Sequence, residues 1–347
     1  MAAGAIALAL SLTLVPIARV GALRFGITDR PANGKVHSVP TPYLGGVAVA
    51  AAVLGAGVLG GWRGDAMAIL GAALLVACVG LVDDVRTAKP SLRLTVEAVA
   101  ACIAFAAGAR VNLLGGGADL ALTVVWLVVL TNAYNLLDNM DACASSIIAV
   151  SAAALLAAAA LGDQVLVGTL AAAVAGAATG FLVYNWHPAH IFLGDAGSLF
   201  LGFLVSAVAL KLRFPTSHAT GVAAVGLVAA PALFDTTLVV VSRARAGRPI
   251  YVGGTDHTSH RLVRLGLAPR AVALLLALVT ATCGFVGVAV GRGALAIWTA
   301  VPPLVLLAVA GFAYLLRTPE GAEETGRLVS APARFTHRSL AEVATDA

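Results

Sequence analysis

A chain of 347 residues that is 60% hydrophobic and 11% charged lies outside the range of soluble proteins, in which about a quarter of residues are charged. The net charge of +5 is modest and the basic residues lie near the ends of apolar runs, so we expect membrane topology and no nucleic-acid partner. The four cysteines show neither metal-site nor disulfide spacing and are interpreted as packing residues. These features predict an all-α, polytopic membrane protein.

Eleven apolar segments approach the length of about 20 residues that a membrane-spanning helix needs. In chain order, we expect helices over residues 4–23, 44–61, 67–83, 92–108, 120–136, 146–161, 164–184, 198–212, 218–241, 270–290 and 294–316. The first segment has no basic region before it, which favours a retained helix over a cleaved signal peptide. We therefore predict a single transmembrane domain over residues 1–316. The tail over 317–347 has no apolar period and is expected to be disordered and cytoplasmic.

The basic residues are distributed unevenly between the two sets of loops. Only five of the 22 Lys and Arg residues follow even-numbered segments; the others follow odd-numbered segments or lie in the tail. Because basic loops stay in the cytoplasm, this bias places the N-terminus outside and the C-terminus inside the cell. Every polar cluster falls on the cytoplasmic side, where we expect the reactive loops.

Adjacent carboxylates end the third apolar segment. Asp83 and Asp84 lie near the negative end of a helix dipole and repel each other, so packing alone does not explain them. A divalent cation or a cationic partner such as Arg93 would relieve the repulsion, and Mg²⁺ takes carboxylates together with substrate phosphates. A solvated pair bridged to Arg86 or Lys89 is the alternative.

The next two clusters are rich in oxygen ligands. Asn132, Asn135, Asp138 and Asp141 follow one another at intervals of three residues, so each neighbouring pair would face one way on a helix. Helix capping would use only one or two of them. In the following cluster, Asp195 lies in a Gly-Asp-Ala-Gly-Ser run between two apolar segments. A carboxylate at a membrane edge is costly without a partner, although helix capping is the simpler alternative.

Two cytoplasmic loops are basic. The first contains Lys35, and the last, residues 243–270, contains His257, His260 and Arg261. Such loops are often only topology signals or contacts for anionic lipid. The cluster around His257 is denser in hydrogen-bond donors than topology requires. Metal ligands and cations at one membrane surface would suit phosphoryl transfer to a lipid.

These loops resemble those of the polyprenyl-phosphate N-acetylhexosamine-1-phosphate transferases, a part of glycosyltransferase family 4. The matching motifs are Lys35-Val36-His37, the Asp83-Asp84 pair, Asn132-x-x-Asn135-x-x-Asp138, the run from Ile191 to Ser198, and the His-containing last loop. The likeness is greatest for the undecaprenyl-phosphate GlcNAc-1-phosphate transferase branch.

The resemblance implies a reaction at the bacterial plasma membrane. A UDP-N-acetylhexosamine would give its sugar-1-phosphate to polyprenyl phosphate and release UMP, with Mg²⁺ or alternatively Mn²⁺ as cofactor. The product would be a lipid-linked pyrophosphoryl sugar for cell-envelope polysaccharide. GlcNAc is the default sugar, and a 6-deoxy-N-acetylhexosamine or MurNAc-pentapeptide is the alternative. The family also implies a membrane-lipid environment and leaves a homodimer open.

The resemblance also implies roles for individual residues. It makes Asp83, Asp84 and Asp195 catalytic, and it makes Asp195 and Asn135 metal ligands. It assigns phosphate binding to Lys35, Arg93, His257, His260 and Arg261, and nucleotide binding to Asn132, Asp138 and Asp141.

Some positions depart from the family pattern. Relatives commonly have glycine where this chain has Asn139 and Ala142, and histidine where it has Ser259. Ala142 would be strained if its φ is positive. These departures bear on nucleotide and sugar selectivity more than on the reaction.

Two other classes of protein, a transporter and a scaffold, are alternatives to an enzyme. A secondary transporter places its polar residues at the membrane midplane, and here only Glu97 and Asp235 are expected to lie deep. A non-catalytic scaffold gives no reason for the Asp83-Asp84 pair. Loss of metal-dependent turnover in Asp195→Asn would distinguish an enzyme from both.

Overall fold

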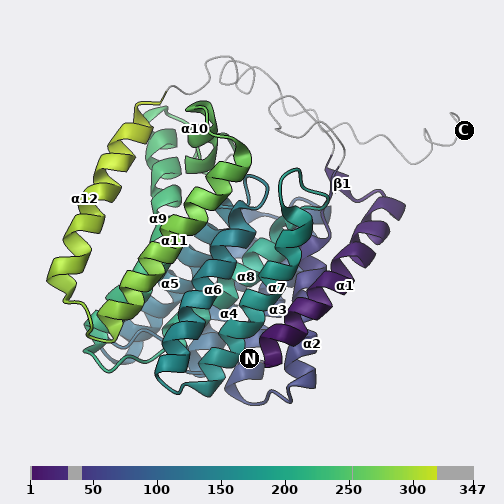
Figure 1. Cartoon of the computed structure of the whole chain (residues 1–347). Helices are drawn as coiled ribbons and strands as arrows, with labels where there is room; N and C mark the ends of the chain where they lie inside the picture. Colours follow the sequence, from purple (N-terminus) through teal and green to yellow (C-terminus); the bar gives the residue numbers. More distant parts are fainter. Residues whose placement is uncertain (1, 30–40, 252, 319–347) are drawn as a thin grey trace, which may run out of the picture.

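The computed structural model describes residues 2–29, 41–251 and 253–318, and this part of the chain is mostly helical (Figure 1). The helices are α1 (Ala2–Arg24), α2 (Gly45–Leu59), α3 (Asp65–Val85), α4 (Pro90–Ala106), α5 (Gly116–Leu136), α6 (Cys143–Leu161), α7 (Val165–Asn185), α8 (Gly194–Lys211), α9 (His218–Arg245), α10 (Thr258–Arg264), α11 (Pro269–Gly291) and α12 (Ile297–Leu316). The short strands β1 (Thr28–Asp29) and β2 (Thr41–Pro42) pair antiparallel. The predicted all-α class is confirmed. Lys35 and the tail from residue 319 lie outside the described residues.

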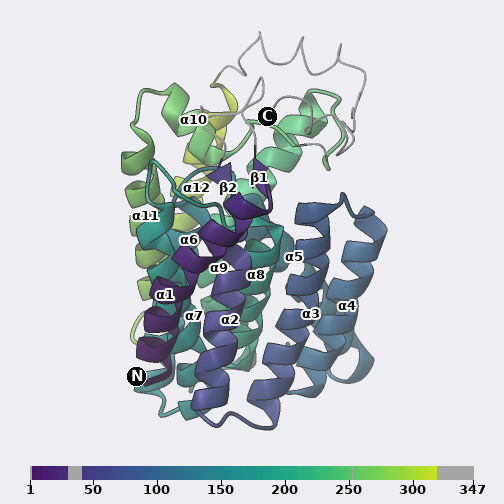
Figure 2. The ribbon, with the colours of Figure 1, turned by 90° about the vertical axis from the view of Figure 1, so that its right-hand side faces the viewer.

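Each predicted apolar segment coincides with a helix. Within the described ranges, nine helices are long and apolar enough to cross a membrane. The other two predicted segments form α2, with 15 residues, and α4, with 17, and both run alongside longer helices (Figure 2). The short helix α10 was not predicted. The chain is therefore a multi-pass membrane protein.

Helix α8 forms the centre of the bundle. It is buried without interruption from Ala196 to Leu210 and packs against α2, α3 and α5. A helix that is apolar all round is stable only when other helices or lipid surround it. Because α8 begins with Asp195, its central position anchors that carboxylate at one end of the bundle.

A glycine allows α3 to approach the start of α8. A Cβ atom at Gly80 would lie 2.5 Å from the carbonyl oxygen of Asp195, closer than real Cβ contacts. The contact brings the last turn of α3, which carries Asp83 and Asp84, against the first turn of α8. The absence of a side chain at Gly80 thus allows Asp83 and Asp84 to lie against the start of α8, in the polar cluster described below.

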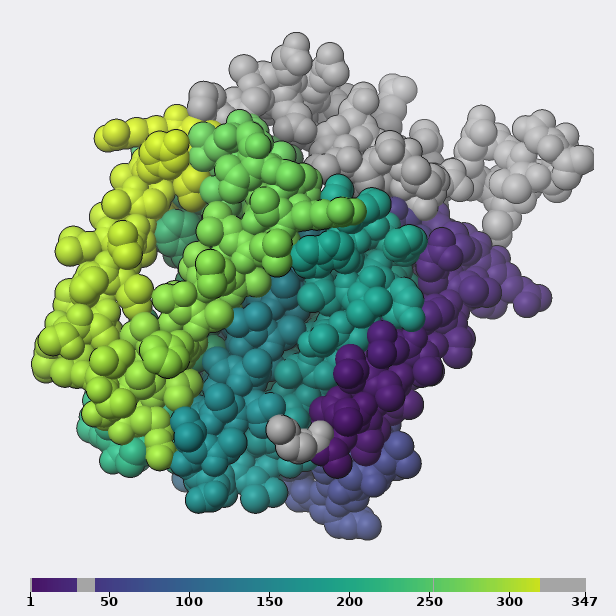
Figure 3. All heavy atoms as spheres, in the orientation of Figure 1, coloured from purple at the N-terminus to yellow at the C-terminus, as the bar shows by residue number. Residues whose placement is uncertain are grey.

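Helix α12 lies at the edge of the molecule. It packs mainly against α9 and α11, and the rings of Phe234 and Phe312 meet edge-on with centroids 5.9 Å apart. Most of its large side chains are exposed, including Trp298 at 83% and Leu306 at 70%. The space-filling view shows an opening between α12 and α11 (Figure 3). In a bilayer, lipid would cover this apolar surface.

Candidate active site

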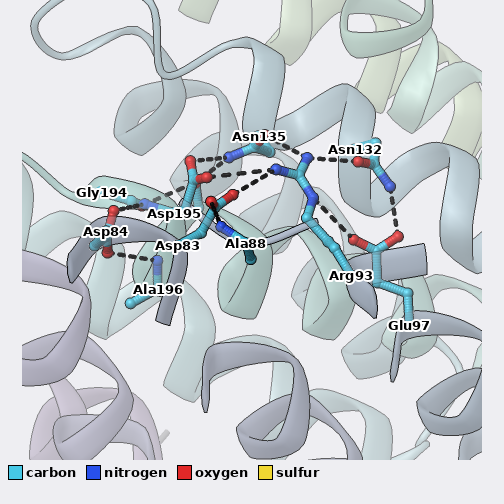
Figure 4. Close-up of polar contacts among 11 residues, drawn as sticks. Asp83, Asp84, Ala88, Arg93, Glu97, Asn132, Asn135, Gly194, Asp195 and Ala196 are labelled. Atoms are coloured by element: carbon cyan, nitrogen blue, oxygen red, sulfur yellow. Dashed lines mark hydrogen bonds and ion pairs between the residues drawn. The ribbon is translucent and has the colours of Figure 1, made fainter. Parts of the chain in front are cut away.

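Polar residues from four helices meet at one end of the bundle (Figure 4). Asp83 lies in the last turn of α3, and α5 ends just after Asn135. Helix α4 begins just before Arg93, and α8 begins just before Asp195. Clusters that are far apart in the sequence therefore share one membrane-edge site, as expected from their placement on a single side.

Arg93 is at the centre of this site. One terminal nitrogen donates hydrogen bonds to the side-chain oxygens of Asn132, at 2.6 Å, and Asn135, at 2.9 Å. The other lies 3.5 Å from Asp83 Oδ2 and 3.4 Å from Asp195 Oδ2. Arg93 thus supplies positive charge between carboxylates from two helices. Its fork of N–H donors also suits phosphate.

Asp84 caps helix α8. Its two carboxylate oxygens accept hydrogen bonds from the backbone N–H groups of Asp195, at 2.8 Å, and Ala196, at 3.0 Å. A negative charge at a helix N-terminus is favourable because the first N–H groups lack partners within the helix. With this cap, and with Gly194 at a φ of +70°, α8 begins at Gly194 and not at the predicted residue 198.

Asp83 differs from its neighbour. Its Oδ1 accepts a hydrogen bond of 2.7 Å from the backbone N–H of Ala88, and its Oδ2 faces Arg93. About a fifth of the side chain, 18%, is exposed. The predicted pair therefore divides into a capping carboxylate, Asp84, and one that faces the polar cluster, Asp83.

Asn135 joins Arg93 to Asp195. Its Nδ2 donates to Asp195 Oδ1 and to Ser198 Oγ, both at 2.8 Å, while its Oδ1 accepts from Arg93. The amide orientation follows from this hydrogen-bond network. For Asn135 to act as a metal ligand, its oxygen would have to leave Arg93.

The donor set fits a hard divalent cation that also binds a substrate. Among the described residues, no three His, Cys, Asp or Glu side chains form a ready-made metal site. Mg²⁺ does not need one, because it is usually held by one or two carboxylates, water and substrate phosphates. Asp195 is suitable because 34% of its side chain is exposed beside Asp83 and Arg93.

The third loop places one more carboxyl close to this cluster. Asp138 lies beyond the end of α5, so it and Asp141 do not share the helical face that their spacing allowed. Burial raises the pKa of Asp138 to about 8, and the charges of Asp195, Asp84 and Asp141 contribute to the rise. Asp138 keeps part of its surface exposed to solvent, but its carboxyl group is surrounded by protein atoms. The shift comes first from burial, and the neighbouring carboxylates add to it.

Asp141 and Ala142 shape the rest of this loop. Asp141 Oδ2 lies 2.8 Å from Nδ1 of His187 and accepts a hydrogen bond of 3.0 Å from the backbone N–H of Ala189. Ala142 has a φ of +64°, in the left-handed region, so the condition stated above for strain at this residue is met. Its backbone N–H donates to the buried Asn185, which fixes the turn before α6.

The last loop is organised by a buried carboxylate on α9. Asp235 Oδ2 lies 2.8 Å from Nδ1 of His257, and Oδ1 accepts a hydrogen bond of 2.6 Å from the backbone N–H of Thr258. The rings of His257 and His260 are 6.0 Å apart at their centroids. Because Asp235 holds Nδ1, the Nε2 atom is the one that His257 can offer to a ligand.

The third and last loops are connected through two unusual residues. Ser259 donates a short hydrogen bond to Oδ1 of Asn139. Both residues depart from the family pattern, and the structure places them in contact. This bond links the loop that carries Asp138 and Asp141 to the loop that carries His257 and His260.

Charged residues also fasten the last loop to α9 and α12. Burial alone would raise the pKa of Asp256, but Arg248 and Arg243 outweigh it and hold the pKa below its ordinary value. Arg261 is 1% exposed and donates to the carbonyl oxygens of Leu315, at 2.8 Å, and Thr318, at 3.2 Å. The Arg261 guanidinium is therefore directed at the end of α12 and not at Arg93 and its partners.

Glu97 and His187 were not predicted to belong to a site, and Asp235 was expected either to pair with a loop arginine or to help shape the site. Glu97 is an ion-pair partner of Arg93, Asp235 orients His257, and His187 contacts Asp141. The spacing of Arg93 and Glu97, four residues apart on one helix, is a signal that the sequence carries. The contacts of Asp235 and His187 join distant segments and have no such local signal.

Comparisons with known proteins agree with this arrangement. The family model described as glycosyl transferase family 4 matches residues 66–213, from the second residue of α3 to just beyond α8. A probable undecaprenyl-phosphate N-acetylglucosaminyl 1-phosphate transferase of Bacillus subtilis is 30% identical and is covered over 78% of its length, with 77% of this chain. A putative glycosyltransferase of Streptomyces coelicolor is 37% identical, with 71% of its length and 84% of this chain covered.

A third relative extends over most of both chains. It is a decaprenyl-phosphate N-acetylglucosaminephosphotransferase of Mycolicibacterium smegmatis, 30% identical over 86% of its length and 88% of this chain. The segment matched by the family model includes Asp83, Arg93, Asn135 and Asp195, which meet in the structure. This chain therefore belongs to glycosyl transferase family 4.

Proposed function

We propose that this protein transfers GlcNAc-1-phosphate from UDP-GlcNAc to a polyprenyl phosphate, releasing UMP and forming a lipid-linked pyrophosphoryl sugar. One observation carries the proposal: the ends of four helices place Arg93 between Asp83 and Asp195 at one end of a membrane-spanning bundle. The relatives that act on undecaprenyl and decaprenyl phosphate support the acceptor and the sugar. Family membership does not favour a transporter.

The residues at the site suit displacement at phosphorus. An oxygen of the lipid phosphate attacks the sugar-bearing phosphorus of the donor, and the bond from that phosphorus to the oxygen retained by UMP breaks. An ionised lipid phosphate has no proton to remove, so positioning and charge neutralisation carry the catalysis. Arg93 binds a phosphate through its N–H fork. Asp83, beside Arg93, serves as base for the protonated fraction of the acceptor.

We propose Mg²⁺ as the cofactor, with Mn²⁺ as the alternative. Asp195 would hold it together with substrate phosphates, with Asn135 beside it. When bound, the ion would supply positive charge to the phosphate oxygens. Among the described residues near Asp195, the carboxylates of Asp83 and Asp84 outnumber the single Arg93 guanidinium, and this surplus of negative charge supports the proposal.

The two outer loops would bind the rest of the donor. Asp138 and Asp141 are proposed to contact the nucleotide, and His257 and His260 the pyrophosphate. The bond between Ser259 and Asn139 supports joint action of the loops. Arg261 would reach a phosphate only after releasing the carbonyl oxygens of Leu315 and Thr318, at and just beyond the end of α12.

We further propose that these loops face the cytoplasm, with the N-terminus outside the cell. The basic residues Arg86, Lys89, Arg243 and Arg245, near the ends of α3 and α9 and the start of α4, support this orientation. We also propose a homodimer, in which the exposed apolar face of α12 would contact a second copy of the chain within the membrane.

The direct test uses purified full-length protein with undecaprenyl phosphate, Mg²⁺ and a panel of UDP-sugars. UMP and the lipid product are measured by mass spectrometry. We expect equal amounts of UMP and lipid-linked GlcNAc from UDP-GlcNAc, and none after EDTA. Turnover of another UDP-sugar alone would change the proposed donor. No product from any donor, with folded protein, would refute the proposed reaction.

A further inference from the structure

Glu97 is a fully buried carboxylate on α4 that the proposed function does not use. Its exposed fraction is 0%, and the chain that buries it is 60% hydrophobic. A buried ionised group is costly unless a cation and hydrogen bonds compensate for it. Its partners therefore indicate what it is for.

Both partners of Glu97 belong to the polar cluster. Its Oε2 accepts a hydrogen bond of 2.5 Å from Asn132 Nδ2, and its Oε1 lies 3.4 Å from Arg93 Nε. An ionised carboxylate only accepts hydrogen bonds. Together with the Val128 carbonyl oxygen, which accepts from the same nitrogen at 2.9 Å, it fixes the Asn132 amide with its oxygen toward Arg93, which donates to that oxygen at 2.6 Å.

The Arg93 guanidinium has buried partners on one side and partly exposed partners on the other. Glu97 and Asn132 lie on one side of the guanidinium, and Asp83 and Asp195 lie on the other (Figure 4). The ion pairs of the guanidinium with Asp83, Asp195 and Glu97 have similar lengths, 3.5, 3.4 and 3.4 Å, but both aspartates are partly exposed, whereas Glu97 is fully buried. The contacts with the aspartates are those that a phosphate or a cation would replace, while the contacts with Glu97 and Asn132 would persist.

We propose that Glu97 is a positioning residue that aims the Arg93 guanidinium at the substrate phosphate. This inference rests on the proposed function. Without the charge of Glu97, the Asn132 nitrogen keeps only neutral acceptors such as the Val128 carbonyl oxygen, at 2.9 Å. Arg93 loses its ion pair on this side and is drawn further toward Asp83 and Asp195. Arg93 would then neutralise the carboxylates and no longer be presented to the phosphate.

Variants at residue 97 separate charge from packing. Glu97→Gln keeps the shape and removes the charge, whereas Glu97→Asp keeps the charge on a shorter side chain. We expect Glu97→Gln to lower kcat/KM by about 10–100-fold, as for other groups that orient a functional side chain, and Glu97→Asp to recover part of it. Asp119→Asn is the matched control, because Asp119 is a buried acid at the start of α5, at the other end of that helix from Asn132 and Asn135.

A double-mutant cycle tests whether Glu97 acts through Arg93. In an Arg93→Lys background, we expect Glu97→Gln to lower kcat/KM by no more than about twofold, because the geometry it supports is already lost. Equal losses in both backgrounds, accompanied by an equal fall in Tm, would show a purely structural role and overturn the inference. Wild-type activity in Glu97→Gln, or a Gln variant better than the Asp variant, would also overturn it.

A second readout does not depend on turnover. Undecaprenyl phosphate should raise the Tm of the wild type more than that of Glu97→Gln, and Asp119→Asn should respond like the wild type. Equal shifts in all three proteins would refute the positioning role. If the wild type releases no UMP, the proposed function fails, and this binding measurement alone decides the inference about Glu97.

Discussion

At the scale of single residues, the two adjacent aspartates at the end of α3 have different partners. Asp84 accepts two backbone N–H groups of α8, whereas Asp83 faces Arg93. The sequence predicts that the pair is functional but cannot divide it, because the division depends on how α3 meets α8. That contact joins residues more than a hundred positions apart.

Alanine at each position should separate the two roles. Asp84→Ala removes a helix cap and should lower the free energy of unfolding by about 1–2 kcal/mol. Asp83→Ala, which removes one hydrogen bond to the Ala88 N–H and a partly exposed ion pair, should lower the Tm less than Asp84→Ala and should reduce UMP release. Thermal unfolding and turnover, measured on the same preparations, check both. A Tm lowered more by Asp83→Ala than by Asp84→Ala would contradict the assignment.

Asp138 predicts a dependence of stability on pH. Its pKa is about 8 in the folded protein and 3.8 ordinarily, so between these values the folded state binds a proton that the unfolded state has lost. Stability should therefore fall as pH rises across this window and level off above it. Asp138→Asn cannot lose this proton, so its stability relative to the wild type should increase as the pH rises across the same window. Tm measured with EDTA from pH 5 to about 9 checks this; a constant difference between the two proteins would contradict it.

At the scale of helices, all eleven predicted apolar segments coincide with helices because their length and hydropathy suffice to define them. Boundaries were harder to predict where a distant side chain decides them. Helix α8 begins at Gly194 because Asp84, on another helix, caps it. The short α10 was missed because its seven residues carry no long apolar period and are held by buried contacts of His260 and Arg261.

Two glycines of α3 test how this helix builds the site. A Cβ at Gly80 would lie 2.5 Å from the Asp195 carbonyl oxygen, whereas a Cβ at Gly71 would meet nothing within 4 Å. Gly80→Ala should push α3 away from α8, lower stability by about 1–3 kcal/mol, and reduce activity. Gly71→Ala should be neutral or stabilise by up to about 1 kcal/mol. Thermal unfolding of both variants decides; equal Tm values would contradict the close approach.

At the scale of the whole molecule, alternation of basic and bland loops predicts which ends of the helices share a side. The structure bears this out for Asp83, Arg93, Asn135 and Asp195, which meet at one end of the bundle. Sequence spacing could not foresee that Arg261 turns toward α12, because a helix that is distant in sequence supplies its partners. The assignment of Lys35 to phosphate binding stays a prediction, since it lies outside the described ranges.

The proposed orientation has its own test. In a cysteine-free background, a cysteine replacing Arg63, in the α2–α3 loop, should react with a membrane-impermeant thiol reagent in intact cells. A cysteine replacing Arg86, in the α3–α4 loop, should react only after permeabilisation. The charge bias between the loops gives this direction. The reverse pattern would place the site outside the cell.

The measurement that tests the central claim most directly compares UMP release by the wild type, Asp195→Asn and Asp65→Asn. Asp65 is a matched control because it also lies in the first turn of a spanning helix, α3, at the end opposite to Asp83. With UDP-GlcNAc, undecaprenyl phosphate and Mg²⁺, Asp195→Asn should lose at least about a hundredfold in kcat, and Asp65→Asn should lose less than about twofold. Equal rates for Asp195→Asn and the wild type would contradict a catalytic centre at this cluster.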